Sequence, residues 1–232
     1  MSTERTANES LQQAIGTMGE PLGRVYHALW NELAWAYLKW GEYVVLFGTK
    51  PSRIDLLNRA AGGFFRIAQD VLWEDVLLHI TRLTESTRSK RRQNDVLSIR
   101  GLPPLINRPD VQKDVHKAVS NACTSAKFAK DWRDRHIAHR ELKRALADSA
   151  APLQPASRAN VKEALAAIAE VLNTIAKAYL STTVMFEWTD TRQGAEQLLY
   201  VLDDGLKAHQ ERLDRLKNGA VRHPEDYAPR DL

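Results

Sequence analysis

Apolar residues recur at three- and four-residue steps over long stretches of this chain, and this spacing constrains the fold more than any other feature. The first series follows Pro21 and consists of Leu22, Val25, Leu29, Leu33, Ala36, Trp40, Tyr43 and Val44. A second series runs from Ile54 to Leu83. Such spacing places apolar side chains on one face of an α-helix, and no segment alternates as a half-buried strand would. The sequence therefore predicts an all-α fold.

Turn residues divide the chain into elements. The first long helix ends at Gly48–Ser52, and the second contains Gly62-Gly63, which indicates a kink or a close helix contact. Further helices are predicted over 95–99, about 111–148 with Asp110 as N-cap, 158–188 with Ser157 as N-cap, and from about 192 to Leu213 or Leu216. We expect a bundle of about five helices in one domain, residues 21–218, between a loose or frayed segment 1–20 and a flexible tail 219–232.

Composition limits the compartment and the class of partner. The net charge of +4 permits a polyanionic partner without demanding one. Cys123 is the single cysteine, so no intrachain disulfide forms and an oxidising compartment gains no support. The polar start lacks the apolar run of a signal peptide, and no stretch approaches the roughly 20 apolar residues that span a bilayer. We expect a cytoplasmic protein that does not enter the membrane.

Two polar residues interrupt the apolar face of the predicted helix over 111–148. At about 100° per residue one stripe contains Phe128, Trp132, Arg135, His139, Leu142 and Leu146. A buried guanidinium or imidazole needs a partner, because leaving it unpaired costs several kcal/mol. An interruption of this kind indicates a functional site or a polar interface.

The same helix carries a motif that resembles a known family. Arg133-Asp134, followed after four residues by His139, is similar to the arginine–polar–spacer–histidine signature of the HEPN superfamily. The segment from Trp132 to Glu141, and the earlier Leu78-His79-Ile80-Thr81-Arg82-Leu83-Thr84-Glu85, resemble the HEPN branch associated with type-U abortive phage infection. The resemblance covers about residues 25–215 and implies a HEPN-like helical domain.

The resemblance implies metal-independent RNA cleavage, in phage defence or a toxin–antitoxin system, at the interface of a homodimer. Arg133 would bind the scissile phosphate, His139 would act as general acid or base, and Asp134 would orient one of them. On one ideal helix Arg133 and His139 lie about 120° apart, so a second copy would complete the site. No cofactor or metal is expected. The resemblance also implies an antitoxin or a nucleotidyltransferase as a possible partner protein.

Several alternatives stay open beside this hypothesis. The domain is equally compatible with a non-catalytic HEPN-like module that binds nucleotide, RNA or a partner protein. Basic side chains beside the motif are predicted to hold RNA, although some match ordinary helix-surface ion pairs: Arg135, His136, Arg140, Lys143 and Arg144.

Other candidate groups favour structural roles. The basic loop Arg88–Arg92 is read as a solvated connector, and Cys123 as a packing thiol. Core or dimer packing is favoured over base stacking for the aromatic group Trp30, Trp35, Tyr37, Trp40 and Tyr43. An acid or metal-ligand role is open to Glu74, Asp75, His79 and Glu85, but a metal site is disfavoured because no third-ligand pattern follows.

Overall fold

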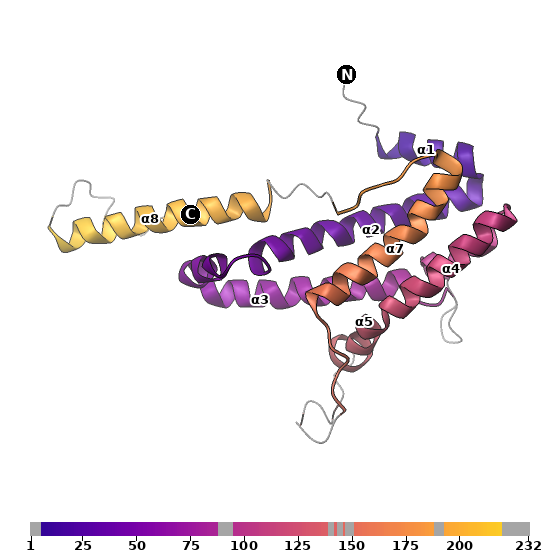
Figure 1. Ribbon diagram of the computed structural model, residues 1–232. Helices are drawn as coiled ribbons and strands as arrows, with labels where there is room; N and C mark the ends of the chain where they lie inside the picture. Colours follow the sequence, from indigo (N-terminus) through magenta and orange to yellow (C-terminus); the bar gives the residue numbers. More distant parts are fainter. Residues whose placement is uncertain are drawn as a thin grey trace. The chain divides into compact units, whose positions relative to one another are not determined.

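The computed structural model describes residues 6–87, 95–138, 142, 146, 151–187 and 193–219. Within these ranges the chain consists of helices and connecting loops without a strand, which confirms the predicted all-α fold (Figure 1). No helix of this described part is both long and apolar enough to cross a membrane. Two compact units are present: Met1–Trp40 with Val71–Thr189, and Gly41–Asp70 with Asp190–Leu232. The boundaries of the single domain stay a prediction.

Helices follow one another along the chain with short connections in most places. In order they are α1 (Ala7–Met18), α2 (Glu20–Phe47), α3 (Pro51–Thr84), the 3₁₀ helices η1 (Ile99–Gly101) and η2 (Pro103–Leu105), α4 (Pro109–Ser125), α5 (Lys127–Trp132), the π-helical segment η3 (Arg133–Ile137), α7 (Arg158–Leu180) and α8 (Ala195–Lys217).

A capped helix occupies most of the segment for which the sequence predicted a loose or frayed lead-in. The Thr6 hydroxyl accepts from the Glu9 backbone N–H at 3.3 Å, and the Glu9 carboxylate accepts from the Thr6 N–H at 2.8 Å. This reciprocal capping box satisfies two donors at the start of α1. Ala14 and Met18 are buried, so α1 also contributes to the core.

In the first unit α2 and α3 pack antiparallel. Lys39 of α2 contacts Asp75 of α3 at 2.7 Å, and Glu32 lies opposite His79, so the residue numbers run in opposite directions along the pair. α4 packs along α7 (Figure 1). Fully buried apolar side chains of these four helices form the core of the unit: Leu22, Leu29, Leu33, Leu77, Ile80, Val115, Leu165, Ile168, Leu172 and Ile175.

The kink, one of the two features that Gly62-Gly63 indicated for the second long helix, is present. Ala61, directly before the two glycines, has non-helical angles (φ −164°, ψ 66°) inside α3. Glycine carries no side chain to stabilise a helical turn, so the helix bends where its propensity is lowest.

Other predicted boundaries were wrong for local reasons. The expected short helix over 95–99 is extended up to Ser98 and becomes 3₁₀ helix from Ile99. Asp110 is not an N-cap, because α4 already begins at Pro109, a residue suited to a first helical turn. The continuous helix over 111–148 is interrupted at Ala126, which separates α4 from α5.

The fourth predicted helix is shorter than expected. Ser157 caps α7 as predicted, but the helix ends at Leu180 because Ser181 adopts a left-handed conformation (φ 52°, ψ 35°). The Asn173 amide then holds the returning chain, since it bonds to both the N–H and the carbonyl of Val184. This return buries Phe186 against Trp30 and Tyr37, with ring centroids 5.8 Å apart in both pairs.

In the second unit a carboxylate from α2 caps helix α8. Glu42 accepts a hydrogen bond from the backbone N–H of Ala195, the first residue of α8. A helix N-terminus has free N–H groups and favours negative charge. Any side chain at position 194 would collide with this carboxylate, so the contact requires Gly194.

Candidate functional site

The backbone at the end of α3 is held in place by the segment that follows it. The buried Ser98 hydroxyl lies 3.1 Å from the carbonyl oxygen of Leu83 and 2.6 Å from that of Glu85. Arg100 donates its Nε–H to the Thr84 carbonyl at 2.8 Å. These contacts satisfy carbonyl groups that a helix C-terminus leaves without partners. The backbone of Glu85 therefore has a fixed position just beyond α3.

Glu85 and Asp134 hold the side chain of Arg133. Nη1 of Arg133 donates to Oε1 of Glu85 at 2.9 Å, across 48 positions of sequence. Nε and Nη2 contact Oδ1 of Asp134 at 2.7 and 2.6 Å. Because a guanidinium has five N–H groups, these three contacts leave two without a partner among the described residues. The arginine is thus oriented by carboxylates while 19% of its side chain remains exposed.

The electrostatic surroundings keep Arg133 charged. Its partial burial acts to lower the pKa, but hydrogen bonds and charge from Glu85 and Asp134 outweigh that effect and raise the pKa above its usual value. The three side chains that these contacts join carry one positive and two negative charges. Glu85 is 24% exposed and Asp134 is 43% exposed, so Asp134 is the more accessible of the two carboxylates.

The motif does not continue as α-helix. Over η3 the backbone is π-helical, and the Ala138 N–H bonds to the Arg133 carbonyl at 2.9 Å, five positions back. A π turn holds more residues than an α turn and is frequent at functional sites. The angle of 120° between Arg133 and His139 assumed an unbroken α-helix, so this part of the sequence reasoning does not apply.

The π-helical segment is anchored to the chain that leads into α7. The Trp132 indole donates to the Gln154 carbonyl at 2.9 Å, and the Asp131 carboxylate accepts from the Gln154 N–H at 2.9 Å. Arg135 contacts Asp131 at 3.3 Å and donates to the Ala151 carbonyl at 2.6 Å. These bonds fix the turn that precedes and contains Arg133.

The structure describes four of the eight residues that the sequence predicted for catalysis and RNA binding. Arg133 and Asp134 are in direct contact. Arg135 donates to the carbonyl groups of residues 151 and 152, and His136 lies edge-on to Trp132 with ring centroids 5.5 Å apart. The remaining predicted residues lie outside the described ranges: His139, Arg140, Lys143 and Arg144. The roles assigned to all of them stay predictions. The loop Arg88–Arg92 also lies outside the described ranges, so its reading as a connector stays a prediction too.

A second polar cluster lies between α2 and α3. His79 is 4% exposed, and its Nε2 lies 3.0 Å from Nζ of Lys39. An ammonium only donates, so Nε2 accepts and the proton of the neutral ring sits on Nδ1. Nδ1 faces Glu32 at 3.6 Å, too far for a hydrogen bond. Burial, reinforced by the positive charges of Arg82 and Lys39 and opposed by Asp75 and Glu32, lowers the pKa of His79.

This cluster links α2 and α3 through the contacts of Lys39 with Asp75 and of Glu32 with His79. Among the described residues no three histidine, cysteine, aspartate or glutamate side chains converge on a common point. Tyr37, Trp40 and Tyr43 are buried, which confirms the predicted packing role for these three aromatic residues, whereas Trp35 is 57% exposed.

The all-α fold and the Arg133-Asp134 pair at the start of an arginine-to-histidine motif agree with the resemblance to HEPN domains. The sequence matches the family model HEPN_AbiU2, described as AbiU2, over residues 19–198. This match covers well over half of the chain, so the protein belongs to the AbiU2 family of HEPN domains, an abortive-infection branch. No curated protein and no solved structure matches the chain.

Sequence reasoning did not assign Glu85 to the site. It was considered only as an acid or metal-ligand candidate, yet it is the residue that holds Arg133 from just beyond the end of α3. A signal for it existed, because Glu85 ends the first of the two segments that resemble the family. The two segments are thus joined in space by the Glu85–Arg133 contact.

Proposed function

We propose that this protein is an endoribonuclease of a phage-defence or toxin–antitoxin system. In this proposal it cleaves RNA without a metal ion at a site shared by two copies of the chain. Arg133 of one copy binds the scissile phosphate, and His139 of the other transfers protons. Two facts support this function: membership of the AbiU2 family, and the orientation of a partly exposed Arg133 by Glu85.

The two carboxylates that contact Arg133 oppose the binding of an RNA phosphate, so one of them must be displaced. A phosphate would meet one positive and two negative charges while both carboxylates hold Arg133, and this repels an anion. Asp134 is the neighbouring residue in sequence and the more exposed carboxylate, so it is the one that leaves. The phosphate then takes the Nε–Nη2 edge of the guanidinium as a bidentate ligand. Glu85 remains on Nη1 as the anchor.

The chemistry follows from these two side chains. His139 takes the proton of the ribose 2′-hydroxyl as O2′ attacks phosphorus, and the P–O5′ bond breaks. His139, protonated in that step, then gives the proton to the departing 5′-oxygen. Arg133 stabilises the negative charge that develops on the phosphate oxygens. The products are a 2′,3′-cyclic phosphate and a 5′-hydroxyl, and DNA is not cleaved because it lacks the nucleophile.

An exposed apolar pair beside the motif supports the homodimer. Leu142 and Leu146 are 70% and 68% exposed, and the Leu146 N–H bonds to the Leu142 carbonyl at 3.0 Å. Two leucines four positions apart on the same turn form an apolar surface that association of two copies would remove from water. A two-fold interface there brings two copies of the motif together.

The test is RNA cleavage by the purified full-length chain. Wild-type protein is expected to degrade mixed RNA in the presence of a chelator and to leave 2′,3′-cyclic phosphate ends. Arg133→Ala and His139→Ala are each expected to lower the rate by at least about 100-fold, the usual scale for removing a charge-stabilising or proton-transfer group. Full activity in both variants would reject the assignment.

A non-catalytic interaction module is the second candidate, and one observation favours it. In the described structure Arg133 is already neutralised by two carboxylates. If this arrangement persists with RNA bound, the arginine serves the architecture of the domain. The wild-type protein would then bind RNA, nucleotide or a partner protein without cleaving RNA, and Arg133→Ala would lower affinity or thermal stability instead.

A further inference from the structure

A cationic pocket of about 630 Å³ lies beside the candidate site in the first unit. Its walls come from the end of α3, η2, α4 and α5, and its basic side chains are Arg100, His116, Lys127 and Lys130. Hydroxyl groups of Ser120 and Thr124 also line it. No carboxylate is among the lining residues of this described part, so the pocket carries uncompensated positive charge.

Two residues that line the pocket lie close in sequence to the residues of the Arg133 site. Thr84, which lines it, immediately precedes Glu85, the anchor of Arg133. Lys130 lies three residues before Arg133, about one helical turn along the same segment. This closeness is the reason to consider the pocket together with the Arg133 site.

The two lysines of the pocket are available to a ligand. Lys127 and Lys130 are exposed, and neither forms an ion pair with another residue of the described ranges. They are three positions apart on α5 and so lie on neighbouring faces of one turn. Arg100 donates its Nε–H to the Thr84 carbonyl, which orients the guanidinium.

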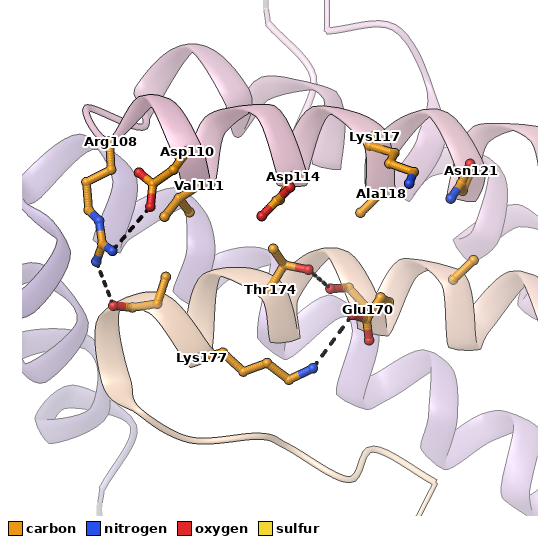
Figure 2. Close-up of a pocket in the computed structure, with 12 residues that line it drawn as sticks. Arg108, Asp110, Val111, Asp114, Lys117, Ala118, Asn121, Glu170, Thr174 and Lys177 are labelled. Atoms are coloured by element: carbon orange, nitrogen blue, oxygen red, sulfur yellow. Dashed lines mark hydrogen bonds and ion pairs between the residues drawn. The ribbon is translucent and has the colours of Figure 1, made fainter.

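A second groove of similar size provides the contrast. It lies between α4 and α7, has a volume of about 660 Å³, and is shown in Figure 2. Its three cations are matched by three carboxylates: Arg108, Lys117, Lys177, Asp110, Asp114 and Glu170. Arg108–Asp110 and Lys177–Glu170 pair at 3.7 Å each. This groove is electrically balanced, so its charge gives no reason to bind a polyanion.

We propose that the cationic pocket binds backbone phosphates of the RNA strand next to the phosphate held by Arg133. Lys127 and Lys130 each contact one phosphate, and the pocket reads no base. The contacts release counterions from the strand, which makes binding depend on salt. The inference rests on the proposed function, because it takes RNA as the ligand of the same site.

Binding of a 2′-O-methyl RNA oligonucleotide to the full-length protein tests this proposal. The modified strand lacks the attacking hydroxyl, so cleavage does not disturb the measurement. Affinity is measured by fluorescence anisotropy over a range of salt concentrations for wild type, Lys127→Ala/Lys130→Ala and the control Lys117→Ala/Lys177→Ala. The control removes the same charge from the balanced groove, and circular dichroism checks that both variants are folded.

Loss of two phosphate contacts is expected to reduce the slope of log K against log salt by about 1.4, and to weaken binding roughly 25-fold at about 0.1 M salt. The control pair should stay close to wild type. An unchanged slope in the pocket variant, an equal loss in the control, or no RNA binding by wild type would overturn the proposal. If wild type binds RNA through the pocket but does not cleave unmodified RNA, the proposed ribonuclease function is rejected and the proposal that the pocket binds RNA is retained.

Discussion

Replacing Glu85 with glutamine tests whether this residue positions Arg133. The ion pair is 2.9 Å long, and its side chains are 19% and 24% exposed. A hydrogen bond between charged groups contributes roughly 1.5–3 kcal/mol and a neutral one about 0.5–1.5 kcal/mol. Because glutamine keeps an acceptor oxygen, the expected loss in the free energy of unfolding is about 1 kcal/mol. For a chain of this length that lowers Tm by about 2–4 °C.

The effect on catalysis should exceed the effect on folding. A guanidinium that leaves its productive orientation loses transition-state stabilisation, and about 1.4 kcal/mol of such loss corresponds to tenfold in rate. We therefore expect kcat of Glu85→Gln to fall about tenfold or more while KM changes little. Glu74→Gln is the matched control, since Glu74 is a glutamate of α3 and makes no ion pair with the described residues. Wild-type kcat and Tm in Glu85→Gln would refute the positioning role.

Two further predictions concern folding and assembly. Leu142→Lys/Leu146→Lys should convert the dimer to monomer in light-scattering chromatography and abolish cleavage, and a dimeric variant would place the interface elsewhere. For His79 the folded pKa lies below the reference value of 6.5, so the unfolded state binds more protons below that pH and stability rises with pH there. When the pH is lowered from about 7.5 to 5.5, the Tm of His79→Gln should therefore fall less than the Tm of wild type. Identical losses would show that His79 does not contribute.

The long helices followed from periodicity because their apolar spacing is nearly uninterrupted. The kink before Gly62-Gly63 and the cap at Ser157 were also predictable, since each depends on the local conformational preference of one or two residues. Helix ends set by distant contacts were not predictable. α7 stops at Leu180 because Asn173 and the packing of Phe186 stabilise the returning chain, and neither contact is visible in the local sequence.

Only part of the candidate site was predictable, because the rest depends on contacts between residues that are distant in the sequence. Arg133 and Asp134 are adjacent in the motif, whereas their partner Glu85 lies 48 positions earlier and meets Arg133 only after α3 has packed. The change from α- to π-helix at Arg133 was not predictable either. The segment is held by bonds from Trp132 and Asp131 to Gln154, which join two stretches of chain separated by about 20 residues.

RNA cleavage by a mixture of two inactive variants tests the central claim most directly. In an equimolar mixture of Arg133→Ala and His139→Ala, about half of the dimers contain one copy of each, and each mixed dimer has one intact composite site of two. The mixture should therefore recover about a quarter of the wild-type rate, although each variant alone is inactive. A mixture that forms mixed dimers and remains inactive would contradict a site shared between two copies.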